Sequence, residues 1–228
     1  RGEDGQMLWS SCGPVVKHLA TLSLKGLIIY EVATLRPVRT LPRKGFFQQL
    51  AWSPDGQHLL GVSNGLGESW TVARMALDSG KVEALSMVDS CTPDWFPDSR
   101  QVIFSNRPPQ QRPPGAYGWT QLWRVDVDTR PTQLVYAEDG RHVYGGVISP
   151  DGKYVVLTGN AQEDGDPSRQ GAEMHLLRLR DTPMIHNPSP ELRARFPDAR
   201  TGPRLALPRG FEPCWTARDI LAQDVPTP

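Results

Sequence analysis

The chain lacks long hydrophobic runs, has no excess of charge of either sign and contains only three cysteines. Its longest apolar patch, residues 26–30, has the length of a strand, whereas a membrane-spanning helix needs about 20 apolar residues. The 25 basic and 25 acidic residues balance, so the basic surface that a nucleic-acid partner requires is not expected. One disulfide with a spare thiol and three free thiols are both compatible with Cys12, Cys91 and Cys214.

Apolar residues at helical spacing are also scarce. Glycine and proline, 21 and 22 residues, are spread along the whole chain instead of being confined to one tract. Many short elements joined by tight turns are typical of all-β proteins. A length of 228 residues suits a single all-β domain.

A motif built around an aromatic residue and a Ser-Pro-Asp-Gly turn repeats along the chain. Its clearest copies are AWSPDGQHLLGVS (51–63), DWFPDSRQVIFS (94–105) and VISPDGKYVVLT (147–158), and weaker copies begin near Trp9 and Trp215. Proline fixes φ at the second turn position and glycine accepts a left-handed backbone at the fourth. Each copy therefore predicts a β-hairpin.

Two further predicted strands follow each hairpin. The repeated aromatic position recurs at Trp9, Trp52 and Trp95, with a spacing of 43 residues, and four strands in that period are typical of a β-propeller blade. We predict an all-β protein, a β-propeller of four-stranded antiparallel blades. The blades cover residues 7–44, 46–87, 90–136 and 143–208, with a partial fifth over 211–224. An insertion over 181–203 is expected to project from the fourth blade, with a short helix over 190–196.

The aromatic residue, the Ser-Pro-Asp-Gly turn, the apolar strand and the Ser-Asn that follows resemble the WD-like repeats of TolB and its relatives. Residues 51–87 match this pattern best, residues 94–135 and 147–180 match it well, and the first and last copies are degraded. The resemblance implies the fold and leaves function open, because such blades occur in periplasmic scaffolds, in peptidase caps and in lyases.

We predict a non-enzymatic protein–protein interaction module, or an accessory or scaffold subunit of a larger assembly. The resemblance implies a periplasmic or otherwise extracytoplasmic location and a protein partner, with a component of a membrane complex among the candidates; no leader sequence is visible. The alternative is an enzyme-associated propeller, either a peptidase cap or a small lyase or hydrolase with its site in the central channel. Mixed residue types at the first-strand positions argue against a channel site: Leu8, Gln49, Asp94, Gly146 and Glu212.

Partner-binding residues are expected in the loop between the second and third strands of the third blade. This loop, NRPPQQRPPGAYG (106–118), carries Arg107, Arg112 and Tyr117, and Trp119 follows it. A stiff, Pro-rich loop with arginine and aromatic residues is typical of an interface hot spot. We therefore predict that these four residues contact a partner.

No metal, cofactor or catalytic residue is predicted. The corresponding loop of the fourth blade contains Glu163, Asp164 and Asp166, and clustered carboxylates can hold Ca²⁺, but their spacing lacks the EF-hand pattern and favours a solvated acidic loop. Residues 61–65 match the G-x-S-x-G motif of serine hydrolases. That motif requires a strand, a turn and a helix, whereas a strand is expected after Ser63.

Overall fold

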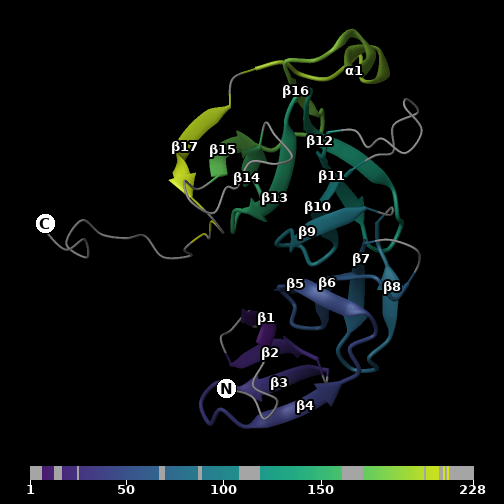
Figure 1. Cartoon of the computed structure of the whole chain (residues 1–228), viewed down its shortest axis with the longest axis vertical. Helices are drawn as coiled ribbons and strands as arrows, with labels where there is room; N and C mark the ends of the chain where they lie inside the picture. The colour runs from purple at the N-terminus through teal and green to yellow at the C-terminus, as the bar shows by residue number, and fades with distance from the viewer. Residues whose placement is uncertain are drawn as a thin grey trace, which may run out of the picture.

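The structure is a computed structural model that describes residues 7–12, 17–24, 26–66, 70–86, 89–107, 119–160, 172–202, 204–210, 213 and 215. These residues form four sheets, antiparallel except for one added strand, and one short helix. The sheets follow an arc, and neighbouring sheets contact one another through their first strands (Figure 1). The predicted class, an all-β propeller of four-stranded antiparallel blades, is confirmed. The predicted partial fifth blade lies largely outside the described residues.

Each sheet is built from strands that follow one another in the chain, except that the strand between β15 and β17 joins the third sheet instead of the fourth. The first sheet contains β1 (Met7–Cys12), β2 (His18–Ser23), β3 (Leu27–Glu31) and β4 (Pro37–Leu41). The second contains β5 (Phe46–Trp52), β6 (His58–Ser63), β7 (Thr71–Ala76) and β8 (Val82–Ala84). The third contains β9 (Ser90–Trp95), β10 (Gln101–Asn106), β11 (Gln121–Asp126) and β12 (Thr132–Glu138). The fourth contains β13 (His142–Ile148), β14 (Tyr154–Asn160), β15 (Ala172–Arg178) and β17 (Leu205–Gly210).

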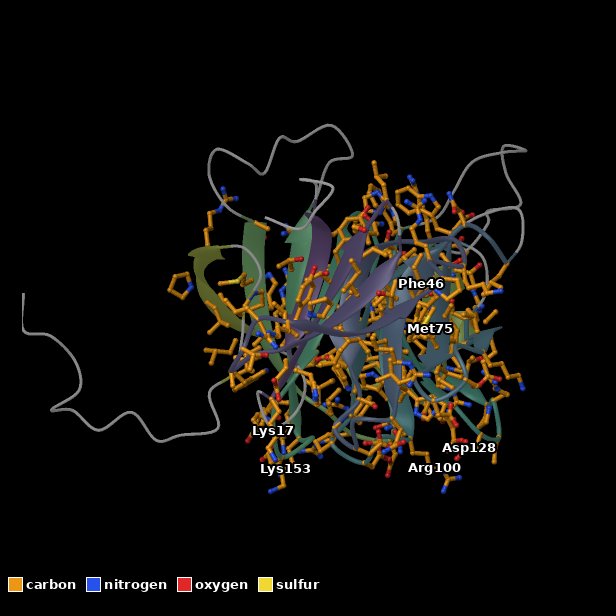
Figure 2. All side chains as sticks on the ribbon, turned by 90° about the horizontal axis from the view of Figure 1, so that it is seen from below. Lys17, Phe46, Met75, Arg100, Asp128 and Lys153 are labelled. Carbon is orange, nitrogen blue, oxygen red and sulfur yellow. The ribbon has the colours of Figure 1, made fainter. Side chains whose placement is uncertain are left out.

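The Ser-Pro-Asp-Gly segments form the hairpin turns that their sequence predicts. In the second sheet the Ser53 hydroxyl donates to Asp55 Oδ1 over 2.6 Å and accepts the amide of His58 over 2.9 Å, while Gly56 has φ 74°. The same two bonds recur in the fourth sheet around Ser149. These turns lie on one face of the molecule, called the lower face, together with the labelled Lys17, Arg100 and Lys153 (Figure 2). At the opposite, upper face the second strand of each sheet ends and the third strand begins.

The hydrophobic core lies between the sheets. Leu59 and Met75 of the second sheet are fully buried against the first sheet, whereas Leu60 and Val72 are fully buried against the third. Side chains alternate between the two faces of a strand, and this alternation lets the second sheet bury both faces. Burial on both faces fixes the spacing of the sheets along the arc.

The insertion of the fourth sheet packs on the third sheet. Its strand β16 (Met184–His186) pairs in parallel with β12, so it becomes a fifth strand of the third sheet. The helix α1 (Pro190–Arg195) begins after Ser189, whose hydroxyl accepts the amide of Leu192. Leu192 is buried in the core of the third sheet. The expectation that this segment projects from its blade is therefore wrong, because its apolar residues are buried against a neighbour.

Replacing Gly61 by alanine is expected to lower the free energy of unfolding by about 2 kcal/mol, the usual cost of overpacking a core. A Cβ at this position would lie 2.2 Å from Cδ1 of the buried Phe46 ring. Urea unfolding followed by tryptophan fluorescence measures the change. Gly202→Ala is the control, since a Cβ there meets nothing within 4 Å, and equal stability of the two variants would contradict the prediction.

A candidate interface on the upper face

The first strands of three neighbouring sheets are joined by a repeated side-chain bond near the centre of the arc. Gln49, Thr92 and Gly145 lie at equivalent β-bulges with φ of 60°, 50° and 68°. Gln49 Oε1 accepts the amide of Thr92 over 2.6 Å, and Thr92 Oγ1 accepts the amide of Gly145 over 3.0 Å. These three positions are the equivalent ones. The expected equivalence of Gln49 with Asp94 and Gly146 is wrong. Gln49 lies three residues before the repeated position at Trp52, whereas Asp94 and Gly146 lie only one and two residues before the same position in their own sheets.

Tryptophan side chains add a second link between sheets. Trp95 Nε1 donates to the carbonyl of Ala51 over 3.2 Å, and Trp215 Nε1 donates to the carbonyl of Val147 over 2.9 Å. Ala51 and Val147 occupy the same place in their sheets, directly before the repeated aromatic position. Trp215 therefore contacts the fourth sheet in the same way that Trp95 contacts the second sheet.

Asp94 provides the corresponding link between the third and fourth sheets, where the repeat carries Ile148 in place of tryptophan. Asp94 Oδ2 accepts the amide of Ile148 over 2.8 Å, and Oδ1 accepts the amide of Trp95 over 2.9 Å. Burial raises the pKa of Asp94 to about 6 although both hydrogen bonds lower it. The carboxyl group thus titrates close to neutral pH.

Two of the predicted partner-binding residues, Arg107 and Trp119, lie at the upper end of the junction between the third and fourth sheets. Arg107 directly follows β10, and Trp119 lies just before β11. The Trp119 ring makes a T-shaped contact with the ring of His142, the first residue of β13, with 4.8 Å between centroids. Tyr144 stacks on His142 at 5.7 Å. Trp119 therefore contacts the fourth sheet, while Arg112 and Tyr117 lie outside the described residues.

His142 is held as a neutral ring. Its Nδ1 accepts the backbone amide of Thr120 over 3.1 Å, so the proton of the neutral imidazole lies on Nε2. Burial and the nearby Arg107 guanidinium hold the pKa of His142 below its usual value. The ring therefore acts at neutral pH as an uncharged bridge between Trp119 and Tyr144.

Next to this stack, a charged cluster fills the junction between the third and fourth sheets. We use the name charged cluster for seven residues: Tyr136, Glu138, Arg141, Glu173, His175, Arg204 and Arg209. In its inner part the Glu138 carboxylate pairs with Arg204 and accepts the Tyr136 hydroxyl over 3.2 Å, and Arg204 Nη1 donates to the Tyr136 oxygen over 2.7 Å. Burial raises the pKa of Tyr136 above its usual value, so the phenol keeps the proton that it donates.

The outer part of the cluster is centred on Glu173. Its carboxylate pairs with Arg141 Nη1 and lies 3.6 Å from Arg209 Nη2 and 3.8 Å from His175 Nε2. Burial raises the pKa of Glu173, but these three basic groups outweigh it and lower the pKa overall. Burial and the Arg204 guanidinium lower the pKa of His175. At neutral pH the carboxylate is therefore charged and the imidazole is neutral.

The charged cluster was not predicted from the sequence. Its members come from β12, the turn after it, β15 and the residues around β17, and the insertion separates the last of these from the others in the chain. One signal was present in the sequence. Tyr136 and Glu138, and likewise Glu173 and His175, are two residues apart and share one face of a strand, so polar groups occupy a face that is otherwise core.

Ser63, the serine of the G-x-S-x-G match, is held by hydrogen bonds to the backbone. Its hydroxyl donates to the carbonyl of Lys44 over 3.2 Å and accepts the amide of Gly65 over 3.1 Å, and the next element in the chain is the strand β7. Cys91 is a free thiol whose pKa burial raises to about 11. Cys214 and the side chain of Cys12 are outside the described part of the chain.

Within the described ranges, no group of three His, Cys, Asp or Glu side chains is arranged to hold a metal ion. The acidic residues Glu163, Asp164 and Asp166 lie outside these ranges. The described part of the chain also contains no helix long and apolar enough to cross a membrane. At the upper end of the junction between the third and fourth sheets, an aromatic ring and several guanidinium groups are available to a ligand.

No family model and no curated protein matches the chain. Solved structures do resemble it. TolB from Acinetobacter baumannii is 19% identical with a TM-score of 0.56, over 76% of this chain and 41% of that one. The tricorn protease is 13% identical with a TM-score of 0.56, over 90% of this chain and 22% of that one. The β-propeller domain of Cps50 (Swd1) from Myceliophteria thermophila is 14% identical with a TM-score of 0.52, over 75% of this chain and 52% of that one.

The chain thus spans about two fifths of the length of the Acinetobacter TolB. At these identities the likeness concerns the fold. It agrees with the Ser-Pro-Asp-Gly turns, the four sheets and the links between their first strands. The chain therefore has the fold of the β-propellers built from TolB-like and WD-like repeats, as its repeats predicted.

Proposed function

We propose that this protein is a non-catalytic interaction module that docks a partner protein on the upper face, at the junction of the third and fourth sheets. The observation that carries the proposal is the Trp119–His142–Tyr144 stack, which joins the residue after a predicted interface loop to the neighbouring sheet. Half-buried aromatic rings beside arginines are typical of interface hot spots. A rigid sheet boundary also limits the entropy lost on binding.

The role of an accessory or scaffold subunit in a larger assembly belongs to the same proposal. So do a partner from a membrane complex and a periplasmic or other extracytoplasmic location. The resemblance of the blades to those of TolB supports these points. Finding the mature protein in the cytoplasmic fraction of its own cells would contradict the location.

Replacing Trp119 by alanine is expected to weaken partner binding at least about tenfold, because hot-spot aromatics dominate interface affinity. The measurement is native capture from the source cells, followed by the mass of the intact complex. Leu35→Ala is the matched control, since Leu35 is exposed in the turn between β3 and β4 on the lower face. Recovery of a lone monomer, or equal capture by both variants, would contradict the proposed interface.

A further inference from the structure

We propose that the outer part of the charged cluster is a binding site for a carboxylate group of an acidic partner peptide, and that Glu173 occupies this site in the free protein. This inference rests on the docking surface proposed above and names the chemistry of its partner. The site consists of Arg141, Arg209 and His175, the three basic groups that converge on the Glu173 carboxylate.

The groups that would contact a partner are accessible. The side chains of Arg209 and Glu173 are 51% and 38% exposed, and that of Arg141 is 22% exposed. Guanidinium groups bind carboxylates through parallel hydrogen bonds, whereas an ion pair this close to solvent contributes little to stability. The carboxylate of a partner can therefore take the place of Glu173 at small cost to the fold.

His175 is the second observation that points to a ligand. The residue is 6% exposed, and neither ring nitrogen makes a hydrogen bond with the described residues. Its Nε2 lies 3.8 Å from the Glu173 carboxylate, beyond hydrogen-bond distance. A buried polar group without a partner costs free energy. A carboxylate placed deeper than that of Glu173 would supply the missing acceptor.

The charge balance of the cluster favours an anion. When Glu173 leaves, Glu138 is the carboxylate that the described residues place beside the two guanidiniums of Arg141 and Arg204. Asp139 is turned toward the insertion, where its Oδ2 accepts the amide of Ser189 over 2.9 Å. Glu138 stays bound to Arg204 and Tyr136. The inner part of the cluster can therefore remain intact while the outer part exchanges its carboxylate.

The test uses a fluorescein-labelled hexaglutamate peptide, titrated with the full chain and followed by fluorescence anisotropy at low ionic strength. Glu173→Gln is expected to bind the peptide at least tenfold more tightly than the unmodified protein, because the competing carboxylate is gone. Adding Arg209→Gln to this variant should reverse the gain. Asp128→Asn also removes one negative charge, but on the lower face, far from the proposed site. This variant should leave binding unchanged.

Equal binding by Glu173→Gln and Asp128→Asn would overturn the proposal, since the gain would then follow net charge alone. Competition with small anions identifies the chemistry: glutarate should displace the peptide at lower concentration than inorganic phosphate, and the reverse order would overturn the carboxylate assignment. Glu173 and Arg209 are partly exposed, so both variants are expected to fold, as thermal unfolding checks. If Trp119→Ala abolishes partner capture while Glu173→Gln gains no peptide binding, the interface stands and the carboxylate site falls.

Discussion

Replacing Glu138 by alanine is expected to lower the free energy of unfolding by about 3–5 kcal/mol, the usual cost of breaking a buried ion pair. The Glu138 side chain is 5% exposed, and its partner Arg204 is 12% exposed. Without the carboxylate, the Arg204 guanidinium is left in the junction without a counter-ion and the Tyr136 hydroxyl loses its acceptor. Urea unfolding at neutral pH, followed by tryptophan fluorescence, measures the loss.

Two comparisons separate the buried charge from other causes. Glu173→Gln, at the exposed end of the same cluster, is expected to change stability by less than about 1 kcal/mol. A double variant with Glu138→Leu and Arg204→Met should be more stable than Glu138→Ala, because it leaves no unpaired charge. A loss below about 1 kcal/mol for Glu138→Ala would mean that water reaches the inner part of the cluster and compensates the guanidinium.

The stability of the unmodified protein relative to Asp94→Asn is expected to increase by about 2–3 kcal/mol as the pH falls from 7 to 4. Folding raises the pKa of Asp94 from 3.8 to about 6, so the folded state binds a proton more tightly than the unfolded state does. The stabilising contribution is complete below pH 3.8 and is lost as the pH rises through 6. The size follows from about 1.4 kcal/mol for each pH unit of the shift.

The measurement is a series of urea unfolding curves for both proteins across this pH range. His142 and His175, whose pKa values are lowered by folding, act in the opposite direction and reduce stability below about pH 6.5, the unfolded value for histidine. Both proteins contain these histidines, so the difference between the two curves isolates Asp94. A difference that stays constant with pH would show that the Asp94 carboxyl is solvated in the folded protein.

The fold was predictable because its information is local and repeated. The Ser-Pro-Asp-Gly turns and the apolar runs after them specify each hairpin, and the repeated aromatic position marks each sheet. The insertion was harder to place, because its fate depends on long-range contacts. Ile185 and Leu192 pack into the core of the third sheet, and nothing in the residues around them distinguishes burial on a neighbour from a projecting loop.

The candidate site was predictable only in part. The composition of one loop singled out Arg107 and Trp119, and the structure places both at the upper end of the junction between the third and fourth sheets. The contact of Trp119 with His142 depends on how two sheets meet, which repeat spacing does not contain. The charged cluster was missed for the same reason. Each of its members, taken alone, has an ordinary place in a strand or next to one, and the cluster exists because the third and fourth sheets are packed together.

The parallel pairing of β16 with β12 has a consequence for how the chain acquires its structure during synthesis. The edge strand and part of the core of the third sheet come from residues 184–192, which leave the ribosome after β13, β14 and β15. The third sheet therefore cannot be completed before most of the fourth has been translated. We expect these two sheets to fold and unfold as one cooperative unit, while the first two sheets can form earlier.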